Sequence, residues 1–167
     1  MMRKVVCVVF LSVLSFGSAY GQTDKYKALF IAKFTEMMRW PGEKESGDIR
    51  IAVAGNDKML KTLTDIAGKT KVRNRSLVVI EYDPTQIEAY HVIYMSDKDK
   101  DRIQEISAQA QAANVVVISD FDRATKDQCN IQFVKLGDKL KYTLNPDRFT
   151  QAGFILSPVL ERNAVRM

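Results

Sequence analysis

The stretch NVVVISD at residues 114–120 places four apolar β-branched side chains in a row between polar neighbours. A strand with one solvated face alternates apolar and polar side chains, whereas a strand covered on both faces is apolar throughout. Sheets covered on both faces are mostly parallel and have helices packed on each side. Residues 115–118 therefore predict a central strand of a parallel sheet in an α/β fold.

Outward from this strand, apolar patterns of strand and helix type alternate along the chain. Further strands are predicted at residues 48–55, 77–82, 91–95, 131–136 and 140–144. Helical spacing predicts helices over residues 23–38, over 59–67, as a short turn over 85–89, from a capping box at Ser96, after Asn145-Pro146, and from Ser157. Gly137-Asp138 predicts a hairpin between the last two strands. The sequence predicts a single α/β domain with a mostly parallel central sheet flanked by helices on both faces, a C-terminal antiparallel hairpin and a helical tail.

The first 21 residues have the pattern of an export signal. Arg3 and Lys4 precede an apolar run over residues 5–16, and small residues follow at Ala19 and Gly21. The run is shorter than the roughly 20 residues that a membrane-spanning helix needs. We expect residues 1–21 to be a cleaved signal peptide, residues 22–167 to form the folded domain, and the protein to be exported from the cytoplasm.

The charge and cysteine content of the chain argue against a nucleic-acid partner and an internal disulfide. Removal of residues 1–21 leaves 23 basic and 20 acidic side chains, a net charge of +3 spread along the chain. A nucleic-acid-binding domain carries a basic stripe on one face, so nucleic acid is not an expected partner. Cys129 is the one cysteine left, which excludes an internal disulfide. It is predicted to be a small buried residue at the start of a strand, with an intermolecular disulfide or a reactive thiol as the alternatives.

The sequence offers no specific catalytic or metal-binding set. His91 is the single histidine and opens a predicted strand, so a structural histidine with a backbone partner is favoured over a catalytic one. One histidine and one mature cysteine argue against a zinc site. Asp97, Asp99 and Asp101 lack the turn glycine of a calcium loop. We therefore predict a protein that is not an enzyme and that uses no cofactor or metal.

The expected carboxyl ends of two strands provide a candidate ligand cleft. In open α/β sheets, ligands bind beyond the carboxyl ends of the strands. Gly55 and Asn56 follow one strand, and Ser119 and Asp120 end another. These four residues are the candidates for a small-molecule site, and helix capping and turn formation are the competing interpretations.

Two segments are candidates for contact with a protein partner. Trp40 ends the first predicted helix, and Asn145, Arg148 and Phe149 lie in the helical tail. Exposed aromatic side chains beside arginine are typical of interface cores. The competing interpretation is that Trp40 caps the core and that Phe149 and Phe154 pack the tail onto the sheet.

Several segments, in order along the mature chain, resemble the YfiR-like family of periplasmic proteins. They are residues 33–36 with Trp40-Pro41, then residues 53–57, 67–69, 75–79, 91–96 and 117–120, and finally Asn130-Ile131, Phe133, Asn145, Ala152-Gly153 and residues 155–157. The resemblance covers essentially the whole chain after the leader. One departure is the cysteine content, since the best-known member of the family has two internal disulfides.

The resemblance implies a function without catalysis. A protein of this family restrains an inner-membrane diguanylate cyclase by binding its periplasmic part, and an outer-membrane lipoprotein can remove the inhibitor. Homodimers are also implied. A periplasmic small-molecule binding module that uses the predicted cleft remains the alternative.

Overall fold

The computed structural model describes residues 18–121 and 126–165. Along the chain the elements are α1 (Ser18–Glu36), β1 (Met38–Arg39), η1 (Gly42–Glu45), β2 (Ile49–Ala54), α2 (Asp57–Ala67), β3 (Lys71–Val72), β4 (Arg75–Glu81), η2 (Pro84–Ala89), β5 (Val92–Ser96), η3 (Asp97–Arg102), α3 (Ile103–Ala112), β6 (Val116–Asp120), η4 (Lys126–Gln128), β7 (Ile131–Leu136), β8 (Lys139–Leu144), α4 (Pro146–Gln151), β9 (Ile155–Leu156) and α5 (Pro158–Asn163), where η marks a 3-10 helix. This order alternates strands and helices, as the apolar periodicity predicts.

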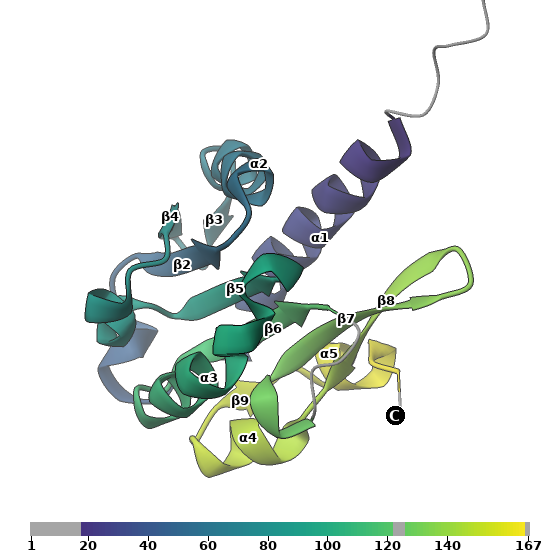
Figure 1. Cartoon of the computed structure of the whole chain (residues 1–167). Helices are drawn as coiled ribbons and strands as arrows, with labels where there is room; N and C mark the ends of the chain where they lie inside the picture. The colour runs from purple at the N-terminus through teal and green to yellow at the C-terminus, as the bar shows by residue number, and fades with distance from the viewer. Residues whose placement is uncertain (1–17, 122–125, 166–167) are drawn as a thin grey trace, which may run out of the picture.

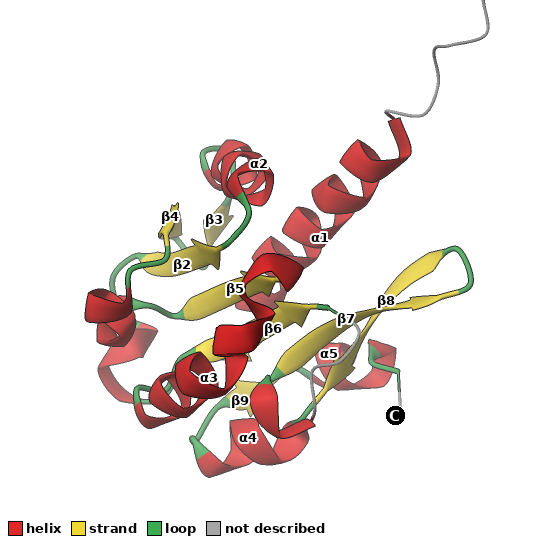
Figure 2. Ribbon diagram, viewed as in Figure 1, coloured by secondary structure: helices red, strands yellow, loops and turns green. Residues whose placement is uncertain are grey.

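A seven-stranded sheet forms the centre of the molecule (Figures 1 and 2). Its strand order is β3-β4-β2-β5-β6-β7-β8. The neighbours from β4 to β7 are parallel, and β3 and β8 pair antiparallel at the two edges. β5 and β6 lie in the middle of the order and are buried over almost their whole length, so both faces of the sheet are covered.

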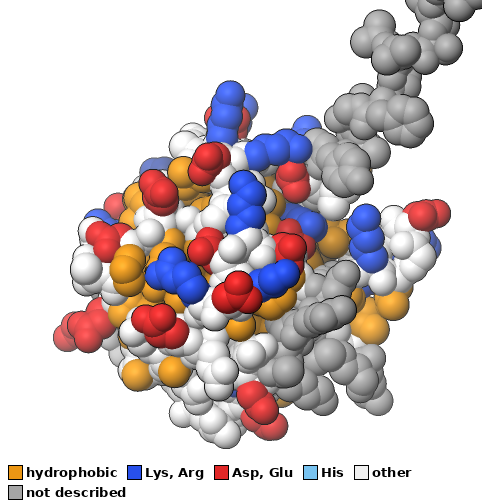
Figure 3. Space-filling view, in the orientation of Figure 1, with side chains coloured by type: hydrophobic (Ala, Val, Ile, Leu, Met, Phe, Trp, Pro, Cys, Tyr) orange, Lys and Arg blue, Asp and Glu red, His pale blue; other side chains and the backbone are white. Residues whose placement is uncertain are grey.

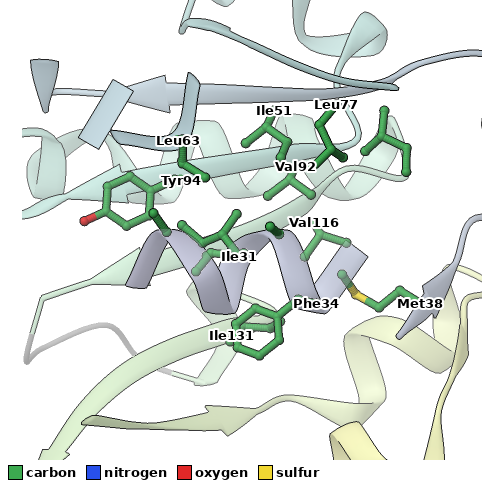
Figure 4. Close-up of a cluster of buried hydrophobic side chains, with 14 of the residues drawn as sticks. Ile31, Phe34, Met38, Ile51, Leu63, Leu77, Val92, Tyr94, Val116 and Ile131 are labelled. Atoms are coloured by element: carbon green, nitrogen blue, oxygen red, sulfur yellow. The ribbon is translucent and has the colours of Figure 1, made fainter. Parts of the chain in front are cut away.

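α1 lies across one face of the sheet, as Figure 4 shows for Ile31 and Phe34. Its buried side chains meet Ile51, Val92, Val116 and Ile131, which project from four neighbouring strands. The same cluster takes in Met59 and Leu63 of α2 and Leu160 of α5. Since fully burying one such side chain is worth roughly 1.5–3 kcal/mol, this cluster is the main source of stability on this face.

α3 covers the opposite face. Ile103, Ile106 and Ala110 recur at helical spacing and pack against Ile93 and Val117. In β6, Val116 and Ile118 contact the α1 side, whereas Val117 contacts the α3 side, as alternation along a strand requires. The predicted fold class, an α/β domain with a hairpin and a helical tail, is confirmed.

The end of the first helix differs from the prediction. The helix was expected to include Met38, but α1 ends at Glu36 and Met38 forms β1, which pairs antiparallel with β9. The main chain at Met37 also accepts a 2.8 Å hydrogen bond from Ser157 N. The tail lies more than 100 residues away in sequence, and its backbone hydrogen bonds hold the residues after Glu36 in an extended conformation. A local helical pattern cannot predict such pairing.

The capping box predicted at Ser96 is wrong. Ser96 Oγ donates to the carbonyl of Gly55 at 2.9 Å, and no side chain caps η3. The segment begins as a 3-10 helix and becomes α-helical only at Ile103. Ser96 is buried at the end of a central strand, so a partner on neighbouring β2 satisfies its hydroxyl in place of the helix terminus.

Phe34→Ala should lower the free energy of unfolding by about 3–5 kcal/mol, because it opens a cavity where α1 meets the sheet. The Phe34 side chain is 1% exposed. Urea unfolding followed by circular dichroism measures the change. Leu29→Ala on the same helix, where the side chain is 44% exposed, is the control and should change stability by no more than about 0.5 kcal/mol. Equal losses in the two variants would contradict the described packing of α1.

Candidate functional site

The carboxyl ends of β2 and β5 form a tight polar corner. Gly55 has a positive φ of 70°, and a methyl group at this position would overlap the carboxylate of Asp99. A left-handed backbone and this close approach both require glycine. Asn56 caps α2 by accepting a 2.9 Å hydrogen bond from Met59 N. The helix-cap interpretation of Asn56 is therefore confirmed.

Asp120 lies at the same edge and is bonded to the buried Tyr94 and the partly buried Lys27. Lys27 of α1 approaches its two carboxylate oxygens at 2.6 and 2.7 Å, and the Tyr94 hydroxyl donates to it at 2.5 Å. Burial, followed by the negative charge of Asp120, raises the pKa of Tyr94 well above its usual value. The phenol therefore stays protonated and acts as a hydrogen-bond donor.

Three of the four predicted cleft residues come together here, and one does not. Tyr94 joins them, since its hydroxyl also contacts the side chain of Asn56. Ser119 is fully buried and donates to Cys129 Sγ at 3.3 Å. Neighbours along a strand point to opposite faces, so Ser119 and Asp120 cannot share one cleft. Lys27 already satisfies Asp120, so a ligand at this carboxylate would have to displace an ammonium of the same chain.

The four predicted partner-binding residues are buried. Trp40 is 3% exposed and donates from Nε1 to the carbonyl of His91 at 3.2 Å. Phe149 is 1% exposed and meets Phe154 edge-to-face at 5.6 Å. The exposed aromatic surface expected around these residues is therefore not found. The competing interpretation, in which they pack the helix end and the tail, is confirmed by their burial.

Arg148 and Asn145 have structural partners as well. The Arg148 guanidinium donates to the carbonyls of Asp127 and Ser107, the latter at 3.2 Å. Asn145 Oδ1 accepts from Arg148 N at 3.4 Å and caps α4. A role of these residues in partner binding stays a prediction, and such a role would have to act through the position of the tail.

His91 is bonded to the backbone through both ring nitrogens. Nδ1 accepts from Arg50 N at 3.1 Å, which leaves the ring proton on Nε2, 3.0 Å from the carbonyl of Lys44. Burial, with a further contribution from the charge of Arg75, lowers the pKa of His91 to about 4. The predicted structural histidine is thus confirmed. Cys129 is buried, with the pKa of its thiol raised by burial, which makes it a weak nucleophile.

A groove that the sequence did not predict lies between the outer face of α1 and β8. It has two adjoining hollows of about 510 and 390 Å³ that share Phe30, Leu140 and Lys141 as lining residues. We call it the α1–β8 groove. Its apolar lining includes Tyr26 and Phe30 of α1 and Leu140 and Tyr142 of β8, and its charged lining residues are Lys33, Lys135, Asp138, Lys139, Lys141 and Arg162.

The shape of the hairpin explains the groove. β6 pairs only with Ile131 and Gln132 of β7, so the rest of the β7–β8 hairpin extends beyond the parallel sheet (Figure 1). The groove lies between this extension and α1. The basic residues around Gly137 are a sequence signal for this groove. They indicate a groove only once the fold places α1 beside the hairpin.

Within residues 18–121 and 126–165, no group of three or more His, Cys, Asp and Glu side chains could hold a metal ion. Nor does any helix in these ranges combine the length and apolar character that crossing a membrane requires.

Lys27→Met should lower the free energy of unfolding by about 2 kcal/mol, because it leaves the largely buried Asp120 carboxylate without its cation. The double variant Lys27→Met/Asp120→Asn should lose less than the sum of the two single variants, since the charge that lacks a partner is gone. Urea unfolding tests both values, with exposed Lys25→Met as the control. Strict additivity would show that the two side chains are not coupled.

Stability should fall as the pH drops from about 6.5 to about 4. The folded protein keeps His91 neutral down to about pH 4, whereas the unfolded chain binds a proton near pH 6.5. The stabilisation is thus complete above pH 6.5, and up to about 3 kcal/mol is lost on acidification. His91→Asn, whose Oδ1 can accept from Arg50 N, should flatten this part of the pH profile of thermal unfolding. An unchanged slope would assign the acid sensitivity to other groups.

Comparison with known proteins gives a family for the chain. No curated protein matches it. A family model described as YfiR/HmsC-like matches residues 24–164, which span the described fold from α1 to α5. This agrees with the motif resemblance, and its coarse implication is a regulatory protein of the periplasm. The chain therefore belongs to the YfiR/HmsC-like family.

Proposed function

We propose that this protein is a non-catalytic periplasmic regulator that binds and restrains a membrane signalling protein, a diguanylate cyclase, in response to envelope signals. The observation that carries the proposal is the family match over residues 24–164. It extends from within α1 to just beyond α5, so the family relation concerns the described fold from end to end.

The chemistry of the described side chains supports a binding role. His91 uses both ring nitrogens for backbone contacts, and the Cys129 thiol is buried. Asp120 is held by Lys27 and Tyr94. These side chains would have to give up existing partners before they could act on a substrate. The α1–β8 groove, in contrast, presents apolar and basic side chains at the surface.

The proposal includes processing and partners. Residues 1–21 would be removed on export and residues 22–167 would remain as the periplasmic domain. An outer-membrane lipoprotein would draw the regulator away from the cyclase, and a second copy of the chain is a further partner. A small-molecule binding module at the strand ends has less support, because Lys27 occupies the Asp120 carboxylate.

Deleting the gene in the bacterium that makes this protein should raise cyclic-di-GMP, because the cyclase loses its restraint. Mass spectrometry of cell extracts measures the nucleotide. Expression of the full chain should restore the low level, whereas a chain that starts at Gln22 and stays in the cytosol should not. The intact mass of exported protein should show Gln22 as its first residue.

Equal cyclic-di-GMP in the deletion and parent strains, with and without envelope stress, would overturn the proposed function. Cross-linking in membranes followed by purification of the regulator should recover a membrane-anchored cyclase. Recovery of a different class of membrane protein would retain a binding role and replace the proposed partner.

A further inference from the structure

The α1–β8 groove combines features that point to one kind of occupant. We propose that it binds an extended, acidic segment of a partner protein, which adds a strand to the outer edge of β8. The identity of the partner rests on the proposed function, but the chemistry of the segment follows from the groove itself.

The first feature is an open strand edge. β8 is the last strand in the sheet order. The Tyr142 carbonyl points away from β7, since it accepts a 2.8 Å hydrogen bond from Val165 N. In an antiparallel strand the backbone groups of alternate residues face the same side, so the N–H and C=O of Leu140 point outwards too. The chain's own tail thus already uses one position of this edge, and a partner strand can use the next.

The second feature is an excess of positive charge. The groove is lined by Lys33, Lys135, Lys139, Lys141 and Arg162, against one carboxylate, Asp138. Lys33 is paired with Glu36, whereas the other four cations form no ion pair with any described residue. On the face that Figure 3 shows, basic and acidic side chains are interspersed. Complementary charge steers and orients a partner, which favours a segment rich in Asp and Glu.

The third feature is apolar surface between the cations. Tyr26 is 51% exposed, and Phe30 and Leu140 are half-buried between α1 and the hairpin. An added strand directs alternate side chains to opposite faces. A segment that alternates acidic and apolar residues would therefore place its apolar side chains toward Phe30 and Leu140 and its carboxylates near the lysines.

A second copy of this chain fits the edge poorly. Antiparallel pairing of two β8 strands centred at Lys139, Leu140 or Lys141 would place lysine directly opposite lysine. Like charges in such cross-strand pairs are destabilising. The same lysines would also protect the edge from aggregation. If that were their entire role, no added segment would bind.

Two synthetic peptides test the groove directly. The first alternates Glu and Val over about ten residues, which matches the charge and spacing of an added strand. The second has Lys in place of Glu. The ¹⁵N-labelled domain of residues 22–167 is titrated with each peptide and followed by NMR. The Glu peptide should shift the amide signals of β8 and of the outer face of α1, and the Lys peptide should shift none of them.

Matched variants make the titration decisive. Lys139→Glu/Lys141→Glu should weaken binding of the Glu peptide by at least about tenfold. Lys61→Glu/Lys69→Glu carries the same change of net charge on exposed residues of α2 and its end, and should alter binding by less than about twofold. N-methylation of the Glu peptide at alternate residues should abolish binding, because it removes the strand hydrogen bonds. Equal binding of both peptides, no binding of either, or shifts confined to another surface would overturn the proposal.

The two proposals can fail separately. Lys139→Glu/Lys141→Glu is expressed in the deletion strain, with export and folding checked by its abundance and its melting temperature. Loss of cyclic-di-GMP restraint in this variant but not in the α2 control supports the groove as the partner site. If both variants restrain the cyclase, the groove proposal fails and the proposed function stands. If the unaltered protein shows no restraint, the proposed function fails and the peptide titration still judges the groove.

Discussion

The burial of α1 across the parallel sheet is the contact on which the rest of the structure depends. Phe34 meets Tyr142 edge-to-face at 4.8 Å and Phe133 at 6.0 Å, so the helix joins the parallel core to the hairpin. The end of the same helix leads into β1, which holds the tail through β9. The positions of hairpin and tail are thus both set by the face that α1 buries. The outer face of α1 stays exposed, and the α1–β8 groove lies between this face and β8.

Polar contacts hold the two ends of the sheet, where the apolar core stops. At the carboxyl ends, Lys27, Tyr94 and Asp120 tie α1 to β5 and β6. At the amino ends, His91 and Arg75 bind the carbonyl of Lys44 and hold the loop around η1. Buried polar groups that are satisfied in this way favour a single arrangement of the chain. The edge at which many α/β folds bind ligands is here used to hold α1 in place.

The sequence predicted the parts of the fold that depend on local pattern. The run at residues 115–118 indicated a strand covered on both faces, and Val116, Val117 and Ile118 are fully buried. It did not predict β1, β3 or β9, since two-residue strands form only when their partners come together. Of the four candidate cleft residues, Gly55, Asn56 and Asp120 lie together and Ser119 does not, and ligand binding there stays a prediction. Asn56 and Asp120 meet through Tyr94, but Lys27 comes from a helix whose placement no local pattern fixes.

The burial of aromatic and charged residues was the least predictable feature, because the same residue types occur in cores and in interfaces. Trp40 and Phe149 suggested an exposed hot spot, yet both pack inside, and the exposed aromatic at the groove is Tyr26. Burial depends on which side of a helix faces the sheet, and on α1 a few positions separate buried Phe34 from exposed Tyr26 and Leu29.

The residues that hold the fold and those that line the groove are largely separate. Exposed lysines on the hairpin contribute little to stability, since surface substitutions usually change it by less than about 0.5 kcal/mol. The charge pattern of the groove can therefore change without loss of the fold, whereas changes at Phe34 or His91 cannot be tolerated in the same way. The binding specificity of such a fold depends on the side chains at its surface. Family membership thus gives the fold and implies a periplasmic regulator, and in our proposal the residues along β8 decide which partner segment the protein recognises.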